Sequence, residues 1–152
     1  MAYLEIGNEA IDFELPNKNG DLIKLSNFKG KKIILYFYPK DNTPGCTLEA
    51  QDFKTNLEAF KAKNAVVFGI SKDSVKSHCG FSDKLELNFE LLSDEEAKVI
   101  KEYGIWQLKK NYGKEYFGIV RSTYIIDESF KIKNIYKVSK VAKHVEKILE
   151  EL

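Results

Sequence analysis

The stretch that decides the fold reads Ile33-Ile-Leu-Tyr-Phe-Tyr-Pro-Lys-Asp-Asn-Thr-Pro-Gly-Cys46, and a helical pattern follows it from Thr47 to Ala62. Its apolar first half, Ile33–Tyr38, is typical of a strand buried at the centre of a sheet. A turn then leads to Cys46 at the start of the helix, where free N–H groups and a partial positive charge gather. Both stabilise a thiolate, the reactive form of cysteine, so Cys46 is a candidate nucleophile.

Strand and helix patterns alternate on both sides of this stretch. We expect an N-terminal hairpin over 13–25, a turn over 26–29, strands over 65–71 and 90–92, and a hairpin formed by 122–126 and 131–138. Helices are expected over 75–85 after Asp73 or Ser74, from Ser93 or Asp94 to about Tyr103, and after Ser139, with 106–120 as a polar connection. This order predicts an α/β fold of the thioredoxin-like type, in which helices flank a central mixed β-sheet and an N-terminal β-hairpin is added.

The composition is that of an ordinary globular protein. The chain has 152 residues, 43% of them hydrophobic and 31% charged, with a net charge of +1, so we expect one domain over 1–152. Interspersed charges do not favour a nucleic-acid partner. The longest apolar run is too short to span a bilayer, and the N-terminus lacks the pattern of a signal peptide. The expected location is the cytoplasm.

Two cysteines in a reducing compartment indicate neither a disulfide framework nor a zinc site. His78 directly precedes Cys79, and His144 lies far along the chain in the terminal helix, so the paired spacings of a metal site are missing. We therefore expect no metal and no cofactor. His78 is expected to face solvent.

Arg121 is the single arginine among 24 basic residues. It stands directly before the predicted strand 122–126. A planar fork that is always charged can hold two partners at once, which lysine cannot do. This favours a functional position beside a thiolate over a place on the surface.

Several separated blocks carry a resemblance to a known family. Pro39, Thr43 and Cys46 match the Pro-x-x-x-Thr-x-x-Cys signature of peroxiredoxins, and 36–50 resembles the peroxiredoxin Q branch, also called bacterioferritin comigratory protein. Further matching blocks, in the right order along the chain, are 71–75, 91–94, 103–106 and 118–127. The resemblance covers essentially the whole sequence.

The resemblance implies a thiol-dependent peroxidase that reduces hydrogen peroxide and organic hydroperoxides. Cys46 would be the attacking, peroxidatic cysteine, and Arg121 would favour its thiolate. The backbone N–H groups of Gly45 and Cys46, together with Thr43 and Arg121, would bind the peroxide, while Pro39 would shield the site from water. Glu49, three residues after Cys46 on the same side of the helix, would hold the Arg121 guanidinium in place.

The sequence departs from the branch at Gln51, where many members carry a second cysteine. The resemblance then leaves Cys79 as the resolving cysteine, which would attack the sulfenic acid of Cys46 and form an intramolecular disulfide. A thioredoxin-type partner would reduce that disulfide. Local unwinding of the helices is expected, and Gly80 weakens the second one by roughly 1 kcal/mol relative to Ala. If Cys79 is silent, the protein is a one-cysteine peroxidase resolved by an external thiol.

Two other functions are weighed against peroxide reduction. A thioredoxin-like disulfide oxidoreductase is disfavoured because that chemistry uses Cys-x-x-Cys and position 43 is Thr43. A non-enzymatic redox sensor on the same fold stays open, since a reactive cysteine serves sensing too. We expect a monomer or weak dimer with no membrane or nucleic-acid partner.

Overall fold

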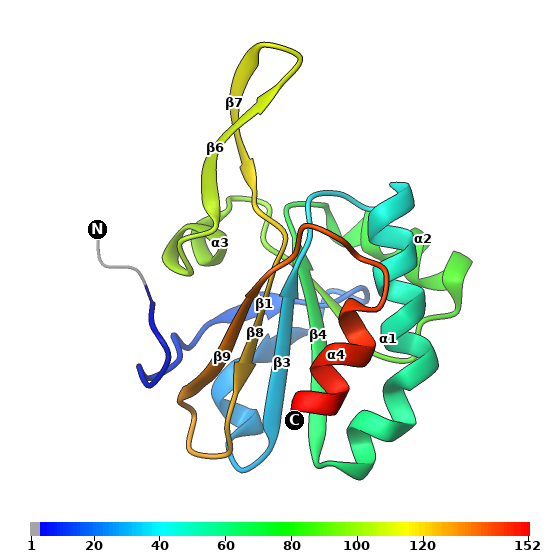
Figure 1. Cartoon of the computed structure of the whole chain (residues 1–152). Coiled ribbons are helices and arrows are strands. Elements are labelled where there is room, and N and C mark those ends of the chain that lie inside the picture. Colours follow the sequence, from blue (N-terminus) through cyan, green and yellow to red (C-terminus); the bar gives the residue numbers. More distant parts are fainter. Residues whose placement is uncertain (1–3) are drawn as a thin grey trace.

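The computed structural model describes residues 4–152. Five strands form the central sheet in the order β5-β4-β3-β8-β9 (Figure 1). They are β3 (Lys32–Phe37), β4 (Ala65–Ser71), β5 (Glu90–Ser93), β8 (Ser122–Ile126) and β9 (Ile132–Lys137). The pairs β3–β4 and β4–β5 are parallel, whereas β3–β8 and β8–β9 are antiparallel. The expected mixed sheet is thereby confirmed.

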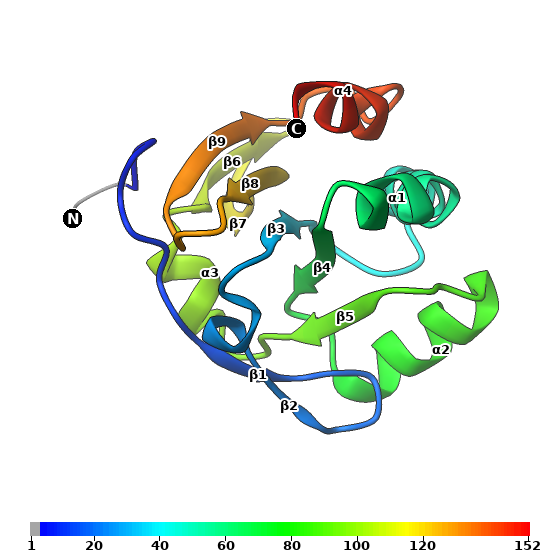
Figure 2. The same cartoon turned by 90° about the horizontal axis from the view of Figure 1, so that it is seen from below.

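The side chains of β3 point alternately to the two faces of the sheet, and each face carries one layer of the core. Ile34, Tyr36 and Tyr38 point to the face covered by α1 (Pro44–Ala62), α2 (Val75–Leu85) and α4 (His144–Glu151). Ile33, Leu35 and Phe37 point to the opposite face. That face carries the short helix η1 (Leu25–Phe28), α3 (Lys98–Glu102) and the N-terminal hairpin of β1 (Glu14–Pro16) and β2 (Leu22–Lys24), as Figure 2 shows. Because both faces are covered, β3 is apolar at nearly every position.

Helix α1 begins at Pro44, two residues before Cys46, where the start of the helix was expected. Thr43 is its extended N-terminal cap, and Pro44 takes the first helical position, where proline costs no hydrogen bond. The first backbone bond of the helix runs from the Thr47 N–H to the Thr43 carbonyl at 2.9 Å. The N–H groups of Gly45 and Cys46 therefore precede the helical ladder and have no acceptor within it.

The prediction of an irregular polar connection over 106–120 is wrong. This segment forms a two-stranded arm of β6 (Trp106–Asn111) and β7 (Lys114–Ile119), which projects from the body of the molecule (Figure 1). Tyr112 and Gly113 make the turn with φ of 52° and 79°. Two consecutive positive φ values match the type I′ turn of a tight hairpin. Tyrosine is not typical of the first position of such a turn, so the sequence did not indicate the hairpin.

Other boundaries differ at helix starts. The N-terminal hairpin, β5 and the Ser74 cap of α2 are confirmed. Helix α3 begins at Lys98 rather than after Asp94, because Ala97 has a φ of 58° and interrupts the helix. Helix α4 begins at His144 rather than after Ser139, because Lys143 has a φ of 65°. Within residues 4–152, no helix has the length and apolarity needed to cross a membrane.

Candidate active site

Cys46 is the third residue of α1, and its side chain lies against the carboxyl end of β3. The residue is only 1% exposed. Nη2 of Arg121 donates a hydrogen bond to its sulfur at 3.2 Å. A Cβ placed on Gly45 would lie 3.3 Å from the same nitrogen, so glycine at this position leaves room for the close approach of the guanidinium.

Arg121 also holds Glu49. Its Nη1 donates to Oε1 of Glu49 at 2.6 Å, and the two side chains are 15% and 0% exposed. One guanidinium thus contacts the thiol and the carboxylate through two different nitrogens. The charges of Glu49 and Cys46 outweigh burial, which by itself lowers the pKa of Arg121, and they raise it above its ordinary value. A lysine ammonium has no such planar fork with which to orient both partners.

Burial raises the pKa of Glu49 from its ordinary value of 4.5 to about 7, and the attraction of Arg121 only partly opposes this rise. The second carboxylate oxygen, Oε2, is buried and has no hydrogen-bond partner in the described part of the chain. Nε2 of His144 lies 4.0 Å from it. Glu49 therefore sits between ionised and protonated forms near neutral pH.

His144 lies far along the chain from Cys46, but the fold brings its ring to within 4.0 Å of Glu49. The first residue of α4 turns its ring toward β8, where Nε2 lies 3.0 Å from Oγ1 of Thr123. Burial and the positive charges of Arg121 and Lys147 lower the pKa of His144 to about 4, so the ring is neutral at pH 7. The contact exists because the apolar stripe of α4 packs α4 against α1. Only that stripe was visible in the sequence.

The turn 39–43 links β3 to α1 and is closed by its own side chains. Oγ1 of Thr43 donates to the carbonyl of Lys40 at 2.9 Å. Asn42 has a φ of 63°, a left-handed conformation that asparagine tolerates. Pro39 and Thr43 are half-buried beside Cys46 in the chain. The hydroxyl oxygen of Thr43 keeps its capacity to accept a hydrogen bond.

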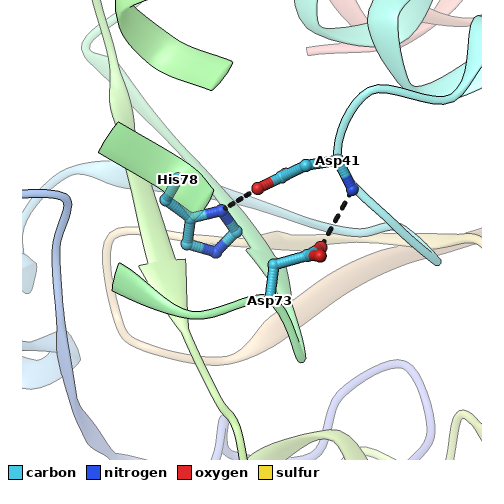
Figure 3. A group of neighbouring side chains, drawn as sticks. All are labelled: Asp41, Asp73 and His78. Carbon is cyan, nitrogen blue, oxygen red and sulfur yellow. Dashed lines mark hydrogen bonds and ion pairs between the residues drawn. The ribbon is translucent and has the colours of Figure 1, made fainter. Parts of the chain in front are cut away.

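His78 is fully buried, contrary to the expectation that it faces solvent. Its Nδ1 lies 2.8 Å from Oδ2 of Asp41, and its Nε2 donates to the Leu92 carbonyl at 3.0 Å. Tyr38 donates to Oδ1 of Asp41 at 2.6 Å. The Asp41 N–H donates to Asp73 at 2.9 Å (Figure 3). The contacts of Asp41 with His78 and with Asp73 join residues more than thirty positions apart, so no local pattern in the sequence predicts them.

Asp41, Asp73 and His78 are the one group in the described residues whose donor atoms lie close enough for a metal ion, within 4.8 Å of one another. Each of the three already has a hydrogen-bond partner inside the group (Figure 3). Ser71 donates a further bond to Asp73 at 2.6 Å. The arrangement is therefore that of a satisfied buried polar cluster.

Cys79 lies on α2, directly after His78. It is half-buried, and its sulfur donates to Oδ2 of Asp83 at 3.7 Å. Cys46 and Cys79 are both free thiols in this conformation. The two sulfurs face different partners, Arg121 and Asp83, so the structure does not bring them together.

Comparison with known proteins gives one consistent result. Residues 6–135 match the AhpC/TSA family. The chain is 48% identical over 149 residues to the peroxiredoxin Bcp of Bacillus subtilis, covering 98% of this chain and 95% of that one. It is 38% identical over 152 residues to the peroxiredoxin Bcp of Escherichia coli, covering 100% and 97%. A PrxQ variant of Xylella fastidiosa superimposes with a TM-score of 0.93 at 34% identity, covering 99% and 96%.

A second similar solved structure has been studied for a named activity. It is the bacterioferritin comigratory protein of Xanthomonas campestris, studied for its alkyl peroxide reduction activity. It superimposes with a TM-score of 0.89 at 35% identity and covers 99% of this chain and 96% of its own. The similarity runs over the whole fold, so it includes the segments that carry Cys46, Glu49 and Arg121.

Proposed function

This chain belongs to the AhpC/TSA family and is a peroxiredoxin, a thiol-dependent peroxidase, and we propose that it reduces hydrogen peroxide and organic hydroperoxides at Cys46. One observation carries the assignment of the residue. Cys46 lies in the first turn of α1, 3.2 Å from a guanidinium nitrogen. The activity named for the Xanthomonas relative supports organic hydroperoxides as substrates.

The chemical step needs a nucleophilic sulfur and a place for the charge that moves onto oxygen. The Cys46 thiolate attacks one peroxide oxygen, an S–O bond forms and the O–O bond breaks. The departing oxygen takes a proton from solvent and leaves as alcohol or water, and Cys46 becomes a sulfenic acid. Arg121 and the N–H groups of Gly45 and Cys46 would stabilise the developing negative charge.

The neighbouring residues have supporting roles in this proposal. Thr43 accepts a hydrogen bond from the peroxide while its own hydroxyl proton stays on the Lys40 carbonyl. Pro39 contributes no N–H that would compete for the substrate and keeps water from the sulfur. Glu49 fixes the orientation of Arg121 through the 2.6 Å hydrogen bond. These roles are supported by the geometry and by the matched motif.

We assign resolution of the sulfenic acid to Cys79, the other cysteine of the chain. A thioredoxin-type thiol protein would reduce the resulting intramolecular disulfide. If Cys79 does not resolve, an external thiol takes that role and the protein is a one-cysteine peroxidase. Two free cysteines fit a reducing compartment, so we place this single-domain protein in the cytoplasm, as a monomer or weak dimer.

Intact mass with thiol counting tests the proposal. Wild type and Cys79→Ser are each treated with one equivalent of hydrogen peroxide. We expect the wild type to lose two hydrogens and both thiols within one molecule, and the variant to accumulate sulfenic or sulfinic acid on Cys46. Oxygen added to Cys46 while Cys79 stays free in the wild type would leave a one-cysteine peroxidase. Absence of rapid change at Cys46 would refute peroxide reduction at this residue.

A further inference from the structure

A buried contact joins the two segments that carry the cysteines. Asp41 lies in the turn five residues before Cys46, and His78 is the residue before Cys79. Their side chains are 1% and 0% exposed and meet at 2.8 Å (Figure 3). This contact lies outside the reaction chemistry described above, yet it connects the start of α1 to α2.

The Asp41 carboxylate is held mainly from α2. Oδ2 receives the His78 contact and also a hydrogen bond from Oγ of Ser77 at 2.8 Å. Oδ1 receives the hydroxyl of Tyr38 at 2.6 Å. The other ring nitrogen of His78 donates to the Leu92 carbonyl on β5. Nε2 must therefore carry a proton, because a carbonyl oxygen can only accept a hydrogen bond.

We propose that the Asp41–His78 contact is a latch that holds α2 against the turn before Cys46 and must open before Cys79 can reach the sulfenic acid. The inference rests on the proposed role of Cys79 and deepens it. Asp41 and His78 are positioning residues, because neither touches the peroxide or the reacting sulfurs. The latch sets the rate of disulfide formation.

Opening is required because of where the sulfurs lie. In resolution the Cys79 sulfur bonds to the Cys46 sulfur, the S–O bond breaks, and the hydroxyl leaves as water with the Cys79 proton. Cys46 is buried beside Arg121, whereas Cys79 faces Asp83 on α2. A disulfide needs Cα atoms within about 7 Å and aligned Cβ directions. Because His78 and Cys79 are consecutive, turning Cys79 toward Cys46 pulls His78 away from Asp41.

The latch should make opening slow. Separating a buried hydrogen-bonded pair leaves polar groups without partners until water reaches them, which is costly. While the latch is closed, Cys46 keeps the geometry in which it meets peroxide. The same closure lengthens the life of the sulfenic acid, so a second peroxide can oxidise it to sulfinic acid. A weaker latch should therefore resolve faster and be less sensitive to overoxidation.

Single-turnover rapid quench with thiol alkylation and intact mass measures the step directly. The first-order rate constant of disulfide formation is read at several hydrogen peroxide concentrations in wild type, His78→Gln, Ser77→Ala and Ser82→Ala. Ser82 is a matched control, because it lies on α2, is buried, and its Oγ has no hydrogen-bond partner in the described residues. Circular dichroism and thermal melting establish that each variant is folded.

We expect disulfide formation to be about tenfold faster or more in His78→Gln, since removing one partner of a buried pair strongly destabilises the closed state. Ser77→Ala should be faster by about threefold or more, because one bond to the carboxylate is lost. Ser82→Ala should match wild type. The sulfinic fraction at high peroxide should fall in the same order.

Unchanged or slower disulfide formation in folded His78→Gln would overturn the latch. If His78→Gln does not fold, Ser77→Ala becomes the test. Disulfide formation at the wild-type rate in Ser77→Ala would also refute the latch. Acceleration in Ser82→Ala as large as in Ser77→Ala would also refute the proposal, because any loosening of α2 would then suffice. Failure of the proposed function gives a different result, since Cys79 would stay free in the wild type and no disulfide would form.

Discussion

At the scale of single residues, the proposed site depends on one guanidinium that contacts both the Cys46 sulfur and the Glu49 carboxyl group. Arg121 contacts the Cys46 sulfur at 3.2 Å and the Glu49 carboxylate at 2.6 Å through separate nitrogens. If Arg121 only supplied charge, lysine would serve as well. The fixed angle between the two nitrogens is what lets one side chain be anchored by Glu49 and aimed at the sulfur.

Arg121→Lys separates charge from geometry. We expect the second-order rate constant for Cys46 oxidation by hydrogen peroxide to fall about 100-fold, comparable to the loss of one donor that stabilises a transition-state charge. Stopped-flow measurement of the peroxide-dependent phase gives the rate constant, and thermal melting checks the fold. A lysine variant within about twofold of wild type would show that positive charge alone is sufficient.

The pKa of Glu49 makes stability depend on pH in an unusual direction. The native state binds this proton more tightly than the unfolded chain, because burial raises the pKa from 4.5 to about 7. The contribution of Glu49 protonation to the free energy of unfolding is therefore complete below pH 4.5. It is lost as pH rises through 7. At 1.36 kcal/mol per pH unit, the loss is about 3 kcal/mol for a fully buried group.

Glu49→Gln tests this dependence through urea unfolding between pH 5 and pH 8. The free energy of unfolding of wild type, relative to the variant, should fall by about 2 to 3 kcal/mol across that range. His144 has the opposite dependence at the acid end, since its pKa is lowered to about 4, but it is present in both proteins. A constant difference between the two curves would contradict the raised pKa of Glu49.

The sequence alone pointed to candidate residues that have a local sequence signal. It did not point to residues whose contacts form only in the folded chain. Cys46 follows from the helix start, and Arg121 stands out as the single arginine. His144, Asp41 and His78 act across distant segments, and nothing adjacent to them in the sequence marks them. His78 was expected to face solvent, because a histidine beside a cysteine carries no sequence pattern that indicates burial.

At the scale of elements, the sheet and helix order was predictable because buried strands here are continuous apolar runs. The predictions were wrong at helix starts and at the β6–β7 arm, where positive backbone φ angles determine the structure. Ala97, Tyr112 and Lys143 all have positive φ, which no propensity of these residue types predicts. Of the three, only Ala97 is buried, so packing can hold its conformation against local preference.

The turn of the arm offers two substitutions with opposite expected effects. Tyr112 is 99% exposed at the first turn position with a φ of 52°. Asparagine is preferred there, so Tyr112→Asn should stabilise the hairpin by about 0.5 kcal/mol. Gly113→Ala should destabilise it by about 1 kcal/mol, because alanine disfavours a positive φ.

Amide hydrogen exchange by NMR measures both variants in the arm itself. The amides of the Leu108–Phe117 region should exchange about twofold more slowly in Tyr112→Asn and about fivefold faster in Gly113→Ala, given that 1.4 kcal/mol is a factor of ten. Amides of the central strand β3 serve as the internal control and should not change. Equal protection in the two variants would mean that the turn does not limit opening of the arm.

At the scale of the whole molecule, the core extends to the site through stacked aromatic rings. Tyr36 on β3 packs on Phe53 of α1 at 4.5 Å between ring centroids and on Tyr38 at 5.4 Å. Tyr38 in turn donates to Asp41 in the turn before Cys46. The ring of Tyr36 fits over β4 because Gly69 is its cross-strand partner. A substitution at Gly69 should therefore also affect the conformation of the turn 39–43.

Gly69→Ala and Gly80→Ala form a matched pair of glycine substitutions. A Cβ on Gly69 would lie 2.6 Å from Cζ of Tyr36 and 2.8 Å from Leu91, whereas one on Gly80 would meet nothing within 4 Å. We expect Gly69→Ala to destabilise the protein by about 1 to 3 kcal/mol through overpacking. Gly80→Ala should stabilise it by up to about 1 kcal/mol, because alanine favours the α2 helix.

Urea unfolding followed by tryptophan fluorescence gives both free energies, with Trp106 as the single reporter. In Gly69→Ala the displaced Tyr36 should also disturb Tyr38, so NMR shifts should change at Asp41 as well as beside position 69. A Gly69→Ala protein as stable as wild type would mean that the Tyr36 ring moves freely and that core and site are not coupled through it.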